Sequence, residues 1–352
     1  MSRIIKYSQA LNEAVDLCLA KDPAVYIMGL GVPDPLGVFG STLGLQEKYG
    51  DKRVMDMPTA ENAMTGIAIG TALAGMRPVM THQRIDFALL AMEQLVNQAA
   101  NWHYMFGGKM KVPLVVRLII GRGWGQGPQH SQSLQSWFSH IPGLKVVMPV
   151  TPYDAKGLLI SSIEDDNPVV FIEHRWLYDI EGDVPEAVYR IPLGKSKLVR
   201  EGRDLTIAAT SYMTLEAIKA ADLLAKKNIG VDVIDIRTLK PLDKDLILKS
   251  VRKTGRLITV DLGWKTAGYA AEIISCIVEE AMTSLKSSPK RITLPDCPTP
   301  TSPALAKFYY PRAVHILREV GKMLGIDVSD LEPAANANIP LDVPDKSFKG
   351  PF

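Results

Sequence analysis

The sequence predicts an α/β protein built from two doubly wound domains, and two observations predict it. Short apolar runs rich in Val, Ile and Leu alternate along the chain with segments that have the apolar spacing of helices. Such continuous runs are typical of parallel strands that helices cover on both faces. The alternation stops over 178–198, where Asp, Glu, Gly and Pro interrupt it, and then resumes. We therefore predict a first domain over 1–185, a linker over 186–199, a second domain over 200–326 and a tail over 327–352.

The first predicted domain alternates helices and strands from its start. Ser8 is a residue type that caps helices, and apolar side chains on one helical face follow it. Short runs of Val, Ile, Leu and Met predict buried strands over 25–28, 54–57, 78–81, 114–119, 146–148 and 169–173. The segments between them predict helices from about 61 to 74, 86 to 104 and 154 to 164.

A second series of elements begins at residue 205. Its apolar runs predict strands over 205–210, 231–236, 257–261 and 291–294. Its helical spacing predicts helices over 215–226, 244–252, 270–280 and 304–324. The final stretch is rich in Pro, Ala, Asn and Asp and has no periodicity, so we expect an extended tail that is mobile or lies along a partner.

Composition and charge argue against several classes of protein function. Lys plus Arg number 40 and Asp plus Glu 38, and this net charge of +2 gives no support for a nucleic-acid-binding face. The most apolar run, 114–120, is interrupted by Arg117 and is too short to cross a bilayer. The N-terminus lacks the pattern of a signal peptide, and three widely spaced cysteines suit neither a disulfide framework nor a metal site. We expect a soluble cytoplasmic protein that binds neither nucleic acid nor membrane.

Four places could carry chemistry, and each also has a purely structural interpretation. Gly121–Gly127 lacks G-x-G-x-x-G spacing, which favours a flexible loop. Glu61 begins a helix, where an acid complements the helix dipole, but strand-to-helix turns of parallel sheets also collect ligands. His130 lies in a polar loop and could act as an acid or a base, although a lone His is more often structural. Residues 165–167 form either a turn or an oxygen-rich cation site.

Several longer motifs run in order through the chain. In the first half they are Glu47–Arg53, Glu61, Gly66–Pro78, Asp86–Leu90, Gln129–Ser133, His140–Pro149, Thr151–Leu158 and Asp166–Pro168. In the second half they are Asp235–Asp243, Lys253–Arg256, Gly263–Trp264 and Asp296–Pro300. By these motifs the chain resembles, nearly end to end, the beta chain of the thiamin-diphosphate-dependent 2-oxo-acid dehydrogenases of the pyruvate and branched-chain type. The resemblance implies a transketolase-like pyrimidine-binding domain followed by a transketolase C-terminal-like domain.

The resemblance also implies roles for residues of the first domain. Glu61 matches the acid that hydrogen-bonds the aminopyrimidine ring of thiamin diphosphate and shifts it to the imino form that deprotonates the thiazolium carbon. Phe87 matches the aromatic residue that packs on the pyrimidine, and Leu30 stands at a position near that ring. His130 matches the active-site histidine that stabilises or protonates the intermediate.

Metals and partners follow from the same resemblance. The turn that contains Ser162, Asp165 and Asn167 matches a structural potassium loop of relatives. Thiamin diphosphate also needs a Mg²⁺-diphosphate site, usually a Gly-Asp-Gly followed by Asn, and no Gly-Asp-Gly occurs in this sequence. The resemblance therefore implies that a separate alpha chain holds the Mg²⁺. Two alpha and two beta chains would form the enzyme, with active sites at their interfaces and a lipoyl acyltransferase as a further partner.

The chain departs from the family pattern at two places in the candidate site. The family has two acids after the first strand, whereas this chain has Leu30 and Gly31, so a polar relay between active sites would lack them. His82, Gln83 and Arg84 stand where the family has apolar residues near the substrate channel. A cationic channel suits a carboxylated, phosphorylated or polyhydroxylated substrate. The alternative is that Arg84 pairs with an acid of the alpha chain.

Three functional hypotheses remain at this stage. The leading one is the beta subunit of an enzyme that decarboxylates a pyruvate-like 2-oxo acid and passes the acyl unit to a lipoyl acceptor. The second is a two-chain transferase of transketolase or acyloin type, which moves a two-carbon unit to an aldehyde or sugar. The third is a non-catalytic scaffold subunit, and the presence of Glu61, Phe87 and His130 argues against it.

Overall fold

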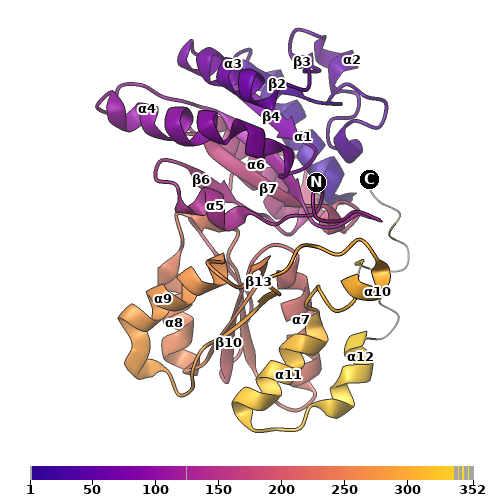
Figure 1. The fold of residues 1–352 in the computed structure, drawn as a ribbon, viewed down its shortest axis with the longest axis vertical. Coiled ribbons are helices and arrows are strands. Elements are labelled where there is room, and N and C mark those ends of the chain that lie inside the picture. Colours follow the sequence, from indigo (N-terminus) through magenta and orange to yellow (C-terminus); the bar gives the residue numbers. More distant parts are fainter. Residues whose placement is uncertain (1, 124, 337–339, 341–342, 345–347, 349–352) are drawn as a thin grey trace.

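The computed structural model describes residues 2–123, 125–336, 340, 343–344 and 348, and it confirms the predicted α/β class (Figure 1). Two units lie one above the other, and each is a mainly parallel sheet flanked by helices (Figure 1). In the described part of the chain, no helix is both long enough and apolar enough to cross a membrane. The limits of the two predicted domains and of the linker stay predictions.

The first sheet has seven strands in the order β12-β6-β7-β5-β4-β2-β3. All neighbours are parallel except β12, which runs antiparallel to β6. The strands are β2 (Val25–Gly29), β3 (Val54–Met55), β4 (Arg77–His82), β5 (Val115–Ile120), β6 (Lys145–Val147), β7 (Val169–His174) and β12 (Thr238–Lys240). The parallel order places the carboxyl ends of β2, β4, β5 and β7 at one edge, where ligands bind in open α/β sheets.

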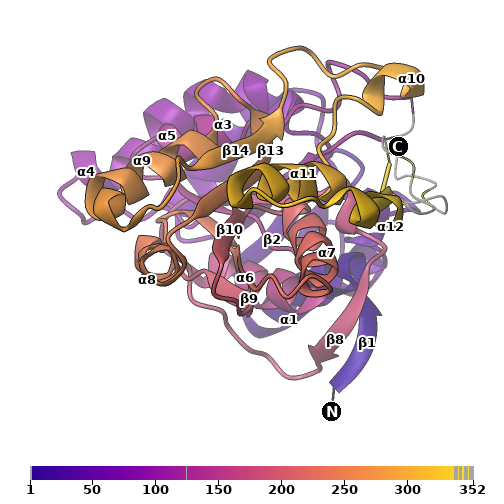
Figure 2. The same cartoon turned by 90° about the horizontal axis from the view of Figure 1, so that it is seen from below.

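The start of the first helix differs from the prediction. Helix α1 covers Tyr7–Lys21, so Ser8 lies inside it and does not cap it. The reason is a strand that the sequence pattern did not reveal: β1 (Ser2–Lys6) pairs antiparallel with β8 (Glu181–Pro185) and leads directly into α1 (Figure 2). Other helices of this unit are α2 (Leu45–Tyr49), α3 (Glu61–Leu73), α5 (Gln135–His140) and α6 (Pro152–Glu164), besides the irregular helix described next.

The helix predicted over 86–104 is present but irregular. It begins as a 3-10 turn, η2 (Phe87–Ala91), continues as a π-helical stretch, η3 (Gln94–Ala99), and ends as α4 (Ala100–Met105). Stretches of π-helix are rare and often lie at functional sites. Here the irregular segment begins at Phe87, one of the candidate site residues.

The second sheet has five strands in the order β14-β13-β10-β11-β9. Its strands are β9 (Lys197–Arg200), β10 (Leu205–Ala209), β11 (Val231–Asp235), β13 (Leu257–Trp264) and β14 (Lys290–Leu294), of which only β9 is antiparallel to its neighbour. Helices α7 (Met213–Ala225), α8 (Lys244–Thr254), α9 (Tyr269–Ala281) and α11 (Ala313–Leu324) flank it. A 3-10 turn, η5 (Met282–Ser284), follows α9.

The end of the chain corrects two predictions. The helix predicted over 304–324 is two helices, α10 (Pro303–Ala306) and α11, because Pro311 between them has no N–H to continue a helix. The tail predicted to be extended instead folds back: η6 (Ser329–Leu331) and α12 (Glu332–Asn336) lie beside α11 and α7 (Figure 2). Leu331 and Ala335 are buried there. The rest of the predicted tail lies outside the described residues, apart from 340, 343–344 and 348.

The two units are joined by β12, which follows the second sheet's β11 but completes the edge of the first sheet. Just before it, the Arg237 guanidinium donates to the buried Asp154 Oδ1 of α6 at 2.9 Å. Burial, and then the charge of Asp154, raise the pKa of the neighbouring Asp235 carboxyl to about 8. The junction is therefore a buried polar cluster as well as a strand pairing.

Candidate active site at the carboxyl ends of the first sheet

Glu61 is the first residue of α3 and borders a hollow in the surface. Its side chain is buried, with 5% of the residue exposed, and no hydrogen bond or ion pair joins its carboxylate to any residue that the structure describes. The hollow has a volume of ≈ 750 Å³, and the residues lining it are Thr59–Ala63, Gly66, Ile67, Leu90 and Gln94. Ile67 and Leu90 are 53% and 66% exposed. A buried carboxylate without a partner beside exposed apolar side chains marks a place that a ligand or another chain completes.

Phe87 and His130 are brought together from two loops at this edge of the sheet. Their rings lie edge to face, with centroids 5.6 Å apart. Asp86, which precedes Phe87, accepts hydrogen bonds from the Gln132 side chain at 2.8 Å and from its backbone N–H at 3.4 Å. These bonds tie the loop after β4 to the loop that carries the exposed His130. The two residues that the family resemblance singled out are thus neighbours.

Leu30 is half-buried at the end of β2, and carboxylates that the sequence did not reveal lie beside it. The Gln83 side chain donates to Leu30 O at 3.0 Å, and the Gly31 N–H donates to Asp56 Oδ1 at 2.9 Å. Gly31 has a φ of +73°, and a Cβ there would meet the Gln83 Nε2 at 2.6 Å and an Asp34 oxygen at 2.8 Å. An acid at residue 31 would require the Gln83 and Asp34 side chains to move and would have to adopt a backbone conformation that favours glycine. Asp34 and Asp56 supply carboxylates next to it instead.

His82 and Arg84 are buried in this chain, and the substrate channel predicted beside them stays a prediction. His82 is 2% exposed, its Nε2 has no partner among the described residues, and burial lowers its pKa to about 4, so it is neutral at pH 7. Arg84 is 5% exposed, and its guanidinium lies near the ring of Phe39. Gln83 is the member of the three that faces the Leu30 loop.

The described residues of the glycine-rich segment, 121–123 and 125–127, lie against the second unit. Gly121 has a φ of +91°, and a Cβ there would meet the His174 ring at 2.6 Å, which explains glycine at this position. The Arg122 side chain donates to Thr301 O at 2.6 Å, and a side chain at Gly127 would strike Thr301. The segment therefore positions the chain that leads to His130.

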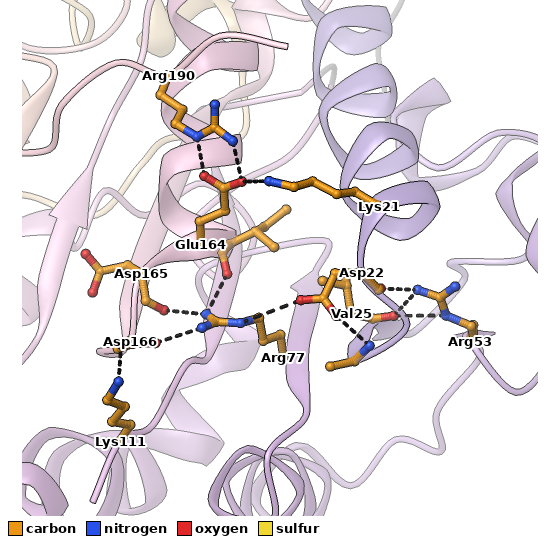
Figure 3. Close-up of polar contacts among 12 residues, drawn as sticks. Lys21, Asp22, Val25, Arg53, Arg77, Lys111, Glu164, Asp165, Asp166 and Arg190 are labelled. Carbon is orange, nitrogen blue, oxygen red and sulfur yellow. Dashed lines mark hydrogen bonds and ion pairs between the residues drawn. The ribbon is translucent and has the colours of Figure 1, made fainter. Parts of the chain in front are cut away.

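In the predicted cation turn, Ser162 lies in the last turn of α6, and Asp165 and Asn167 follow the helix. Figure 3 shows Asp165 at this place. The Asn167 backbone and side-chain amides donate to Asp165 Oδ1 at 2.8 and 3.1 Å, and Lys145 pairs with the same carboxylate. The Arg77 guanidinium donates to Ile163 O at 3.1 Å and to Asp165 O at 3.0 Å (Figure 3). The turn is rich in oxygen atoms, but Arg77 and Lys145 already share several of them.

Among the described residues, no group of three or more His, Cys, Asp or Glu side chains could hold a metal ion. The three cysteines are free.

Comparisons with known proteins identify two domains of the transketolase type in this chain. The transketolase pyrimidine-binding domain matches residues 3–180, and the transketolase C-terminal domain matches residues 194–316. A solved structure described as a split-gene transketolase, inactive beta4 tetramer, has the same fold, with a TM-score of 0.74 at 22% identity over 92% of this chain and 99% of that one. Fold and site thus define a transketolase-like protein of the thiamin-diphosphate-dependent class.

Curated relatives narrow the class further. The chain is 42% identical over 334 residues to the acetoin:2,6-dichlorophenolindophenol oxidoreductase subunit beta of Cupriavidus necator, covering 92% of this chain and 98% of the relative. It is 40% identical over 319 residues to the pyruvate dehydrogenase E1 component subunit beta of Rickettsia felis, covering 91% and 98%. The chain belongs to the family of these beta subunits.

Proposed function

We propose that this chain is the beta subunit of a heteromeric thiamin-diphosphate enzyme that decarboxylates a pyruvate-like 2-oxo acid and passes the acyl unit to a lipoyl acceptor. The observation that carries the proposal is Glu61, whose buried carboxylate has no partner in the described part of the chain and borders an open hollow. The names of the relatives support the enzyme class. We also propose a cytoplasmic location, which the three free cysteines support.

The residues around Glu61 suit one half of thiamin diphosphate. When bound, the cofactor supplies a carbon nucleophile that side chains of this chain do not provide. Glu61 would hydrogen-bond the aminopyrimidine ring and fix its tautomer, because a carboxylate kept from other partners is free to do so. Phe87 would pack against the ring face and orient it. His130, exposed in the loop next to Phe87, would give a proton to the substrate oxygen.

We propose that an alpha chain completes the site and holds the diphosphate and Mg²⁺. Two observations support a partner at this place. The hollow beside Glu61 is open, and its rim carries Ile67 and Leu90, which are more than half exposed. The sequence also has no Gly-Asp-Gly for a Mg²⁺-diphosphate site. The open hollow supports a partner at this place. Two alpha and two beta chains, as the family resemblance implies, would form the enzyme, and a lipoyl acyltransferase would carry the lipoyl group that accepts the acyl unit.

The experiment that tests this function is reconstitution. The complex combines this chain with the alpha chain of its own organism. We expect it to decarboxylate a 2-oxo acid when a dye accepts the electrons, and to acylate lipoamide. Both activities should require thiamin diphosphate and Mg²⁺. Each chain alone is expected to be inactive. Turnover by the isolated beta chain, or none by the complex with any 2-oxo acid or acyloin, would contradict the proposal.

A second candidate is an acyloin- or transketolase-type transfer of a two-carbon unit. The polar residues His82, Gln83 and Arg84 favour it, because the family has apolar side chains there. The acetoin oxidoreductase relatives also favour it by name. The same complex separates the two candidates: an acyloin would reduce the dye faster than any 2-oxo acid, and lipoamide would not be acylated from a 2-oxo acid.

We also propose a K⁺ ion at the turn after α6. The carbonyl groups of Ser162, Ile163 and Asp165 lie at the carboxyl end of this helix, where its dipole is negative. Each carbonyl oxygen has two lone pairs, so those bonded to Arg77 can still accept a cation. The ion would share the Ile163 and Asp165 carbonyl oxygens with Arg77 and the Asp165 carboxylate with Lys145.

At constant ionic strength, K⁺ is expected to raise the melting temperature of the full chain above its value in Na⁺ or choline. At ten times its dissociation constant, the ion would stabilise the fold by about 1.4 kcal/mol. In the Asp165→Asn variant the K⁺ effect should disappear, whereas the exposed Asp51→Asn control should keep it. Equal melting temperatures in the three salts would mean that Arg77 and Lys145 alone satisfy the turn.

A further inference from the structure

The candidate site has one rigid side, which is the turn that carries Phe87. The Ile85 N–H donates to Ile119 O of β5 at 2.9 Å, and the Phe87 N–H donates to Arg84 O at 3.2 Å. The side chains of Ile85 and Ala88, on either side of Phe87, are fully buried. These contacts hold the turn against the sheet, so a side chain that starts from it has a fixed origin.

The segment that carries His130, on the other side of the site, is more exposed. Gly125, Pro128, Gln129 and His130 are exposed, and the His130 N–H donates to Gly127 O at 3.2 Å, within the same segment. Glycine leaves such a segment considerable conformational freedom. A proton donor must lie within hydrogen-bond reach of its acceptor, and a misplacement of about 1 Å can cost about 10²-fold in rate. The position of the His130 ring therefore needs a further constraint.

Asp86, in the rigid turn, supplies this constraint through Gln132. Its Oδ1 accepts hydrogen bonds from the Gln132 side chain at 2.8 Å and from the Gln132 backbone N–H at 3.4 Å. Gln132 is two residues from His130, and Ser131 between them is buried, with 2% exposed. The rings of His130 and Phe87 meet edge to face, with centroids 5.6 Å apart. One carboxylate thus joins the rigid side of the site to the segment that carries the histidine.

The environment of the Asp86 carboxylate strengthens these contacts. Asp86 is half-buried, and its Oδ2 is buried without a hydrogen-bond partner among the described residues. Burial raises the pKa of Asp86, whereas the hydrogen bonds from Gln132 and the charge of His130 lower it. A hydrogen bond to a carboxylate that is partly removed from water is electrostatically stronger than one in water. The bonds from Gln132 are therefore strong enough to hold a loop.

We infer that Asp86 is a positioning residue for the reaction: through Gln132 it holds the His130 ring beside Phe87, where the imidazole can reach the substrate oxygen. The inference rests on the proposed function, in which His130 gives a proton to that oxygen. Asp86 itself neither gives nor takes a proton. Phe87 supplies the surface against which the imidazole rests, and the Asp86 carboxylate limits how far the segment can move away from it.

The first test measures steady-state turnover of a 2-oxo acid by the assembled alpha–beta complex with a dye acceptor. Asp86→Ala is expected to lower kcat about 10- to 100-fold, which corresponds to the loss of a hydrogen bond to a charged group. It should change KM by no more than about twofold, because Asp86 does not hold the substrate. Asp86→Asn keeps an oxygen acceptor for Gln132 and should recover part of the loss. Asp51→Ala, the same change at an exposed position, should leave kcat as it is.

A double-mutant cycle tests whether Asp86 acts through His130. His130→Ala removes the proton donor, so adding Asp86→Ala to it should lower kcat no further. Two losses that multiply would show that Asp86 acts apart from His130 and would overturn the inference.

The alternative is that Asp86 serves only as a counter-ion of the buried Arg84. Burial lowers the pKa of Arg84 to about 10, and the charge of Asp86 opposes this shift. If balancing this charge were the whole role of Asp86, Arg84→Met would restore the kcat of Asp86→Ala, and the inference would be wrong. We expect no such recovery.

A second measurement, by NMR of the full chain, does not depend on turnover. The ring current of Phe87 shifts the signals of the His130 ring, and Phe87→Leu provides the unshifted reference. Asp86→Ala is expected to move the His130 signals toward that reference, and Asp86→Asn should leave them closer to the wild type. The signals of His315, on α11 of the second unit, should stay in place. Unmoved His130 signals in Asp86→Ala overturn the inference.

The two measurements separate a failure of the inference from a failure of the proposed function. A complex that turns over a 2-oxo acid equally well with Asp86→Ala overturns the inference and leaves the proposed function intact. A complex without turnover contradicts the proposed function, while the His130 signals of the full chain still show whether Asp86 holds the ring.

Discussion

Replacing Glu61 by alanine in the assembled alpha–beta complex is expected to lower turnover about 10²- to 10⁴-fold, the range in which a positioned acid or base contributes. The buried carboxylate has no partner within the described chain, so its expected partner is the aminopyrimidine ring. Steady-state decarboxylation with a dye acceptor measures the loss. Exchange of the proton on the reactive cofactor carbon, followed by NMR, should slow in parallel, because Glu61 acts before the substrate binds.

The control for this experiment is Glu201→Ala, which removes a carboxylate from an exposed position and should leave turnover and proton exchange unchanged. Loss of Glu61 also removes an acid from the first turn of α3, which costs the fold only about 0.3–1 kcal/mol. The variant should therefore still fold and bind its partner. Unchanged turnover in Glu61→Ala would reject the catalytic hypothesis and return the chain to the class of scaffold subunits.

Replacing Glu173 by alanine is expected to destabilise the fold by about 3–5 kcal/mol. Glu173 on β7 and Arg117 on β5 form a two-point ion pair of 2.6 and 3.0 Å, and neither side chain is exposed. The Tyr178 hydroxyl also donates to Glu173, and Arg117 donates to the Ser41 hydroxyl at 2.8 Å. Removing the carboxylate leaves a guanidinium buried without its counter-ion, and this desolvated charge is the source of the loss.

Thermal unfolding of the full chain measures this effect. The exposed pair of Arg318 and Glu332 provides the control: Glu332→Ala should cost at most about 1 kcal/mol, because solvent screens that pair. The double variant Arg117→Met, Glu173→Met should be more stable than Glu173→Ala, since it buries no unpaired charge. A melting temperature of Glu173→Ala equal to that of Glu332→Ala would contradict this account.

Local patterns in the sequence sufficed to predict most strands and the helix that Glu61 begins. Apolar runs mark the parallel strands because both faces of the sheet are covered, and this signal needs no knowledge of the partner strand. The family resemblance singled out Phe87 and His130, and the structure brings their rings together. Whether they act on a cofactor stays a prediction.

Features that depend on distant segments could not be predicted in this way. Ser8 has the residue type of a helix cap, but the pairing of β1 with β8 leads directly into α1, and its N-cap is Lys6, two residues earlier. Arg84 after β4 and Arg175 after β7 both lie near the Phe39 ring because only β5 separates these strands in the sheet, and strand order cannot be read from a local pattern. Asp56 reaches Gly31 for the same reason, from the neighbouring strand β3.

The strand β12 has a consequence for how this protein could be divided or recombined. It belongs by sequence to the second unit, yet its backbone satisfies the outer edge of β6 in the first. A cut between the two units would expose the backbone N–H and C=O groups of β6, which invites pairing with other chains and aggregation. Because the two units share this sheet edge, we expect a fragment that ends between β6 and β12 to aggregate more readily than the full chain.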